Sequence, residues 1–85
     1  MAKLIFAKLF ELHDLHEYQV LVTKEYDPED DTFKIVQTID FEDVRPSLSL
    51  GFKDENKCNE YFDAYDKERA MIFLKEIKST IEANF

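Results

Sequence analysis

The chain of 85 residues is poor in the residues that build many catalytic motifs, with one glycine, two prolines, one cysteine and no tryptophan. Because Gly51 is the only glycine, the chain has neither a glycine-rich phosphate-binding loop nor the G-x-S-x-G turn of a serine hydrolase. Cys58 has no second cysteine to pair with, which excludes an intramolecular disulfide and favours a reducing compartment. These absences argue against an enzyme.

Long hydrophobic runs are also missing. The N-terminal stretch MAKLIFAKLFEL is interrupted by Lys3, Lys8 and Glu11, and no small-residue cleavage site follows it. A signal peptide has an uninterrupted apolar stretch, and a membrane span needs about 20 apolar residues. We therefore expect a cytoplasmic protein without a membrane partner.

Positive charge is in short supply, with 11 Lys and Arg against 19 Asp and Glu and a formal net charge of −8. Proteins bind duplex nucleic acid largely by neutralising phosphates with basic side chains, so nucleic acid is an unfavoured partner. A protein with a basic patch would suit this charge better. The apolar content of 45% predicts a folded chain, and the length predicts a single domain over residues 1–85.

Three stretches alternate between apolar and polar residues, which is typical of strands. They are residues 17–26 (EYQVLVTKEY), 32–41 (TFKIVQTIDF) and 47–52 (SLSLGF). The acidic segment DPEDD at 27–31 separates the first two and has the composition of a turn. The pattern predicts a hairpin followed by a third strand.

Two further segments fit either a strand or a helix. Residues 2–12 consist of good helix formers, yet they alternate, and we interpret them as a central strand. In residues 58–65 (CNEYFDAY), Cys58, Phe62 and Tyr65 would align on a helix, but the segment also alternates. We interpret it as a strand, because Asp66 has the features of an N-cap that starts a new helix. The preceding DENK at 54–57 is interpreted as a turn.

The C-terminal segment is the clearest helix in the chain. Its apolar residues recur at spacings of three, four and seven, as Ala70, Phe73, Leu74, Ile77 and Ile81. The whole pattern predicts an α+β fold, with a four- to five-stranded antiparallel meander and one C-terminal helix packed on one face.

A single helix would leave the other face of such a sheet uncovered. That face should be polar if it meets water, but apolar residues are assigned to it. An exposed apolar face is a candidate association surface. We predict an interaction surface, most simply a homodimer interface, from residues of the sheet and from Ile72 on the helix: Ile5, Leu9, Leu21, Val36, Tyr61, Tyr65 and Ile72.

The motif HDLHE contains His13 and His16, the only histidines of the chain. Metal-binding histidines on a helix lie four residues apart, whereas these are three apart, and no third ligand is indicated. Cys58 is interpreted as a small buried hydrophobic residue, and the acidic run at 25–31 as a solvated loop. We expect no catalytic residue, metal or cofactor.

Three functions remain open. The favoured one is a small non-enzymatic interaction module that acts by homodimerisation or protein binding. An alternative is a single-stranded nucleic-acid binder, since the layout resembles that of the PUR, PC4 and Whirly proteins at the level of fold. This alternative needs lysines and tyrosines to form one basic, stacking face. The third is an acidic inhibitor that mimics nucleic acid, suggested by the carboxylates at 25–31 and 40–43.

Overall fold

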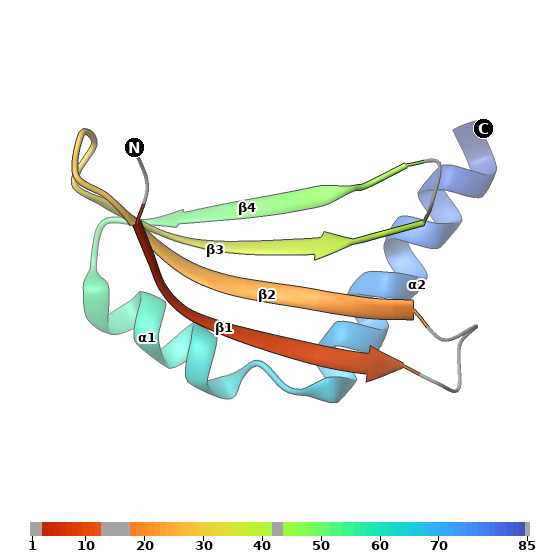
Figure 1. Ribbon diagram of the computed structural model, residues 1–85, viewed down its shortest axis with the longest axis horizontal. Helices are drawn as coiled ribbons and strands as arrows, with labels where there is room; N and C mark the ends of the chain where they lie inside the picture. The colour runs from red at the N-terminus through yellow and green to blue at the C-terminus, as the bar shows by residue number, and fades with distance from the viewer. Residues whose placement is uncertain (1–2, 13–17, 42–43, 85) are drawn as a thin grey trace.

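The computed structural model describes residues 3–12, 18–41 and 44–84, and it contains a four-stranded antiparallel sheet with two helices. The strands are β1 (Lys3–Leu12), β2 (Tyr18–Asp27), β3 (Thr32–Ile39) and β4 (Ser47–Phe52). They lie side by side in chain order, β1-β2-β3-β4, as a meander (Figure 1). The strand predictions over 2–12, 17–26, 32–41 and 47–52 are therefore confirmed, apart from one or two residues at their ends. The central position expected for 2–12 is wrong, because among the described strands β1 pairs only with β2 and forms an edge of the sheet.

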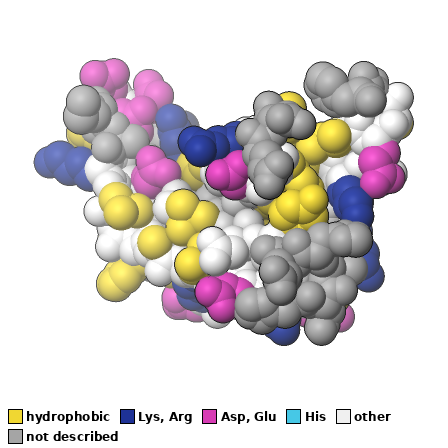
Figure 2. All heavy atoms as spheres, turned by 45° about the vertical axis from the view of Figure 1, so that its right-hand side comes forward, with side chains coloured by type: hydrophobic (Ala, Val, Ile, Leu, Met, Phe, Trp, Pro, Cys, Tyr) yellow, Lys and Arg dark blue, Asp and Glu magenta, His cyan; other side chains and the backbone are white. Residues whose placement is uncertain are grey.

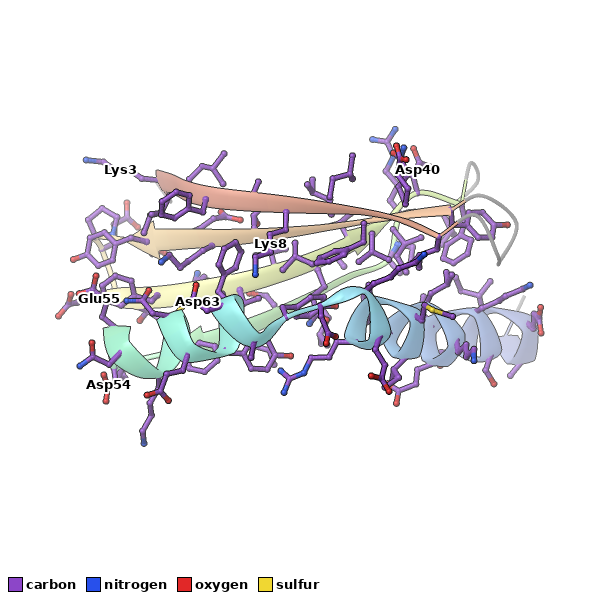
Figure 3. All side chains as sticks on the ribbon, turned by 90° about the horizontal axis from the view of Figure 1, so that it is seen from below. Lys3, Lys8, Asp40, Asp54, Glu55 and Asp63 are labelled. Carbon is purple, nitrogen blue, oxygen red and sulfur yellow. The ribbon has the colours of Figure 1, made fainter. Side chains whose placement is uncertain are left out.

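Both helices cover the same face of this sheet. Helix α1 spans Glu55–Ala64 and helix α2 spans Lys67–Asn84. Seen from below, the strands form one layer and the helices a second layer, with nothing from the described residues over the outer side of the sheet (Figure 3). The predicted α+β class and the uncovered face are confirmed, whereas a fifth strand and a single helix are not found in the described part of the chain.

The segment 58–65 was the wrong prediction, because it belongs to α1. Asp54 caps this helix, since its side chain accepts a hydrogen bond from the Asn56 backbone N–H at 2.9 Å. The assigned turn at 54–57 is thus the cap and first turn of α1. On this helix Cys58 and Phe62 lie one turn apart and are both buried. This agrees with the helical alignment of these residues that was considered as the alternative to a strand. The aspartate followed by Glu55 was the overlooked start signal.

The core lies between the sheet and the helices. Each strand contributes alternate residues to it, and each helix contributes one face. Its fully buried members include Leu12, Val20, Val22, Ile35, Ile39, Cys58, Ala70 and Leu74. Helix α2 begins as predicted after Asp66, whose carboxylate accepts a hydrogen bond from the Arg69 N–H at 3.0 Å. Neither described helix is long and apolar enough to cross a membrane.

Candidate functional site

The seven residues predicted to form one interaction surface lie on two opposite sides of the sheet. Leu9, Leu21 and Val36 lie on the uncovered side, and Ile5 lies in a β-bulge beside them. The other three, Tyr61, Tyr65 and Ile72, belong to the helix layer. Placing the two tyrosines on the uncovered side was wrong, since it assumed that 58–65 was a strand. Tyr65 is in fact buried in the core, with 3% of its surface exposed.

The uncovered side of the sheet, here called the open face, presents aliphatic side chains to solvent. Leu9 and Leu21 are directly opposite each other on β1 and β2 and are 55% and 40% exposed. Near the other end of β1, Leu4 and Ile5 are 64% and 41% exposed. Figure 2 shows hydrophobic side chains reaching the surface between charged groups. Several exposed apolar side chains on one face of a sheet mark a candidate association surface.

The charged groups on the open face are few and nearly balanced. Glu25 accepts a hydrogen bond from the Thr23 hydroxyl at 2.7 Å, and Arg45 lies 3.4 Å from the Asp40 carboxylate. A shallow depression of about 210 Å³ lies at the Arg45 end and has Leu9 and Leu21 in its lining. The open face therefore carries little of the net charge of −8. The two helices together sum to only −1, whereas the hairpin tip at 27–31 carries four carboxylates and no basic residue.

A second concave surface lies on the opposite side of the molecule, between β3, β4 and the two helices. This groove has a volume of about 330 Å³. At its base Gln37 accepts a hydrogen bond from the Tyr65 hydroxyl at 2.6 Å, and both side chains are buried. Its complete lining is Gln37, Leu48, Tyr61, Tyr65, Arg69, Ile72, Phe73 and Glu76.

Aromatic and charged groups shape this groove. The Arg69 guanidinium lies 5.1 Å from the centre of the Tyr61 ring, within the range of a cation–π interaction. Burial raises the pKa of the Tyr65 hydroxyl to about 12, so the group stays neutral and donates a hydrogen bond to the Gln37 Oε1 atom. The sequence signal for the groove was Gln37 itself, a polar residue at a position of β3 that faces the core.

Two lysines point from the sheet into the helix layer. Lys24 is only 8% exposed and donates to Asn59 Oδ1 at 2.6 Å. Lys8 donates to the carbonyl oxygens of Phe62 and Tyr65, at 2.5 and 3.3 Å, where α1 ends (Figure 3). Helix C-termini leave such carbonyls unpaired and favour a positive charge. These lysines therefore stabilise the docking of α1.

This arrangement separates the residues that a nucleic-acid-binding sheet would require. Lys8 and Lys24 face the helices, and each lies within 6 Å of the Phe62 ring centre, at 4.5 and 5.7 Å. Tyr18 stacks edge-on against Phe41, and Tyr26 packs on Phe33. By strand alternation both tyrosines are on the helix side, so the described residues do not bring lysines and aromatic rings together on the open face.

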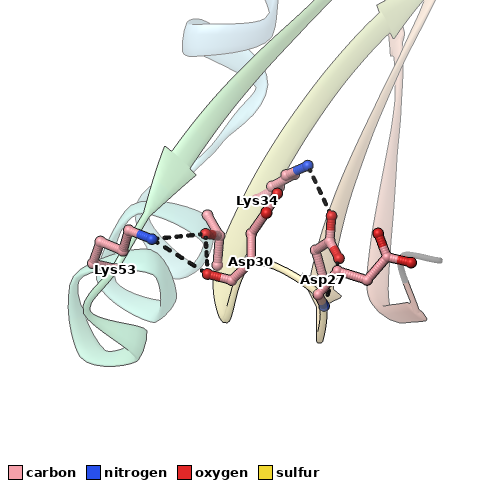
Figure 4. A network of polar contacts seen from close by, with 6 residues as sticks. Asp27, Asp30, Lys34 and Lys53 are labelled. Atoms are coloured by element: carbon pink, nitrogen blue, oxygen red, sulfur yellow. Dashed lines mark hydrogen bonds and ion pairs between the residues drawn. The ribbon is translucent and has the colours of Figure 1, made fainter.

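The acidic segment at 27–31 forms the tip of the β2–β3 hairpin, and its polar groups are used locally (Figure 4). Asp27 accepts a hydrogen bond from the Glu29 N–H at 3.0 Å, which lowers the pKa of this carboxyl, with a smaller contribution from Lys34 at 3.4 Å. Lys53 reaches the Asp30 carbonyl oxygen at 3.3 Å. Asp31 adopts a positive φ of 50°, which aspartate tolerates in turns. These contacts fit the structural role that was predicted.

The residues that could take part in catalysis or metal binding are Cys58, the acidic side chains and the two histidines. Cys58 is fully buried, as predicted, and its burial raises the pKa of the thiol. Among residues 3–12, 18–41 and 44–84, no three His, Cys, Asp or Glu side chains converge as metal ligands would. His13 and His16 lie outside the described residues, so the interpretation of HDLHE stays a prediction.

The geometry defines an α+β protein with an open, four-stranded antiparallel sheet and both helices on one face. No protein-family model matches the chain, and no match is found among curated proteins or among solved structures. The function of the protein is therefore inferred from the residues and contacts of this chain alone.

Proposed function

We propose that the protein is a non-enzymatic interaction module that forms a homodimer through the open face of its sheet. The observation that carries this proposal is the exposure of the aliphatic side chains on that face, with Leu9 and Leu21 paired across β1 and β2. Burying them against a second copy would remove apolar surface from water, which is the dominant favourable term in association. Two such sheets pack face to face at a separation of about 10 Å.

The size of the open face supports this use. A ten-residue strand such as β1 extends about 33 Å at 3.3 Å per residue, and four strands spaced about 4.8 Å apart span roughly 15–19 Å. Because β3 and β4 have only eight and six residues, the face offers an area of roughly 400–500 Å² per copy. Two copies together reach roughly 800–1,000 Å², which is the size of a weak homodimer interface.

Charge also favours a second copy over a strongly charged partner. The open face pairs its charges locally, as in the ion pair of Asp40 and Arg45. Two chains of net charge −8 repel each other least when they meet across their most neutral surfaces. An acidic inhibitor would instead meet its cationic target through the hairpin tip at 27–31, and the experiment below distinguishes this second function from the homodimer.

The test measures molecular mass by light scattering for the wild type and for Leu21→Asp. We expect the wild type to have twice the chain mass of 10.1 kDa. The variant should be monomeric, because it places one carboxylate per copy at the centre of the interface. The substitution is compatible with folding, since Leu21 is 40% exposed in the single chain.

The matched control is Ile72→Asp, which introduces the same charge at a similarly exposed residue, 51%, on the helix side. It should remain dimeric. A wild type that is monomeric at high micromolar concentration overturns the proposal. So does a dimer that Ile72→Asp dissociates and Leu21→Asp does not. If the monomer binds a cationic protein in a salt-sensitive manner, the acidic-inhibitor alternative is supported instead.

A further inference from the structure

The groove between β3, β4 and the two helices has the dimensions of a small-molecule site. Its volume of about 330 Å³ lies within the usual range of about 300–1,000 Å³ for ligand pockets. It forms because α1 and α2 diverge as they leave their junction near β1, which leaves part of β3 and β4 uncovered (Figure 1). This groove lies on the side of the sheet opposite the open face, so it is independent of the proposed homodimer.

Gln37 at the base of the groove has an unused hydrogen-bond donor. Its side chain is 96% buried, since only 4% of its surface is exposed. Its carbonyl oxygen accepts from the Tyr65 hydroxyl, but its amide N–H groups meet no acceptor among the described residues. In the described part of the chain, every buried side-chain nitrogen or oxygen atom has a hydrogen-bond partner. Because the Gln37 amide nitrogen has none, it must be accessible to solvent. The amide can therefore donate a hydrogen bond to an acceptor atom of a ligand that enters the groove.

The walls of the groove define the rest of the ligand. Leu48 and Ile72 are 44% and 51% exposed and present aliphatic surface, and the Tyr61 ring adds an aromatic surface. Arg69, stacked on Tyr61, supplies the positive charge. Glu76 lies seven residues further along α2, about 10 Å away at 1.5 Å per residue, and disfavours an anion at that end. The preferred anion position is therefore the Arg69 end.

We propose that this groove binds a small planar aromatic carboxylate. One carboxylate oxygen accepts a hydrogen bond from the Gln37 amide, and the Arg69 guanidinium neutralises the charge. The aromatic ring system lies between the Tyr61 ring and the side chains of Leu48 and Ile72. Binding is non-covalent and leaves the fold unchanged.

The experiment titrates the ¹⁵N-labelled full chain with 2-naphthoate and follows amide resonances, including the side-chain NH₂ of Gln37. A fragment of this size should bind with a dissociation constant of about 0.1–1 mM. We expect the largest shifts at Gln37, Leu48, Arg69 and Ile72. 2-Naphthylmethylammonium, which has the same rings but a cation and no acceptor, should bind at least about 10-fold more weakly.

Three variants localise the site. Arg69→Gln and Gln37→Met should each weaken 2-naphthoate binding at least about 5-fold while the spectrum of the free protein stays folded. Arg45→Gln is the matched control, since it removes the arginine of the open-face depression, and it should leave the dissociation constant unchanged. The Arg69→Gln result carries the test alone if Gln37→Met fails to fold.

Three results would overturn the inference: no shifts at millimolar 2-naphthoate, shifts centred on Leu9 and Leu21, or equal binding to the wild type and Arg69→Gln. Equal binding of the cationic analogue would contradict the assigned carboxylate. None of these results bears on the homodimer, which is tested by molecular mass. Conversely, a monomeric protein that binds 2-naphthoate in the groove would overturn the proposed function and leave this inference standing.

Discussion

Each face of the sheet carries an exception to the usual rule that charged side chains are exposed and apolar ones are buried. The helix-covered face includes Lys24, which is 8% exposed, whereas the open face includes Leu9, which is 55% exposed. Lysine is among the residues least often buried, and an isolated buried ammonium group is costly. Here its charge meets the Asn59 amide oxygen at 2.6 Å and the rings of Phe6 and Phe62.

Position relative to the helices therefore decides which side chains of the sheet are buried, even where residue type favours the opposite. Lys8 and Lys24 alternate with apolar residues on their strands and point toward α1 by strand parity. The leucines of the open face have the opposite parity and no helix above them. A buried lysine needs a hydrogen-bond acceptor within the chain. The exposed leucines, in contrast, can be buried only by a second molecule.

The largest expected effect is on the covered face. Phe62 is 4% exposed and contacts Phe6, with ring centres 6.5 Å apart, as well as both lysines. Phe62→Ala should lower the free energy of unfolding by about 3–5 kcal/mol, through lost burial and the cavity that remains. Urea denaturation of the variant measures this change.

The matched substitution on the open face is Leu9→Ala, studied at a concentration where the chain is monomeric. Because Leu9 is already 55% exposed, its change should stay within about 0.5 kcal/mol. Equal losses for Phe62→Ala and Leu9→Ala would contradict the assignment of the two faces.

An intermediate effect is expected from Tyr65, whose hydroxyl is buried on the covered face. Its folded-state pKa is raised to about 12, above the unfolded value near 10. The neutral hydroxyl thus contributes stability that is complete below pH 10 and is lost as the pH rises through about 12, a loss of about 1–3 kcal/mol.

Denaturation of the wild type and of Tyr65→Phe between pH 8 and pH 12 tests this expectation, with the same pH range for both. The variant loses the hydrogen bond to Gln37 and should start less stable, but its stability should fall less over this range. Parallel pH profiles of stability for the two proteins would contradict the raised pKa of Tyr65 in the folded state.

The smallest effect expected on the covered face concerns the lysine that caps α1. Lys8→Met keeps the aliphatic stem but removes the donor to the carbonyl oxygens of Phe62 and Tyr65. It should cost about 1 kcal/mol of stability, which thermal unfolding measures. Lys34→Met is the control on the open face, where the partly exposed ion pair with Asp27 at 3.4 Å is expected to contribute less. A larger loss for Lys34→Met would reverse the comparison.

Local patterns predicted most of the fold. Alternation placed the four strands, because one side of each strand packs on a core and the other does not. Capping and three-four spacing placed α2 after Asp66. The segment 58–65 was missed because eight residues fit both periods almost equally well. The deciding signal was outside it, at Asp54 and Glu55.

The candidate site was less predictable. The open face followed from alternation, so Leu9, Leu21 and Val36 were found. The groove depends on residues far apart in sequence, with Gln37 on β3, Tyr61 on α1 and Arg69 on α2. No local pattern reports the angle at which two helices diverge, and this angle sets the groove.

The amino-acid sequence by itself determined the strands, the C-terminal helix and the acidic character of this protein, because these depend on neighbours along the chain. The tertiary structure decided which lysines are buried, that Tyr65 lies in the core and that the predicted surface divides into an open face and a groove. These properties depend on where α1 docks, and that docking joins Lys8 and Lys24 to residues more than 30 positions away. Such long-range contacts exist only once the whole chain has folded.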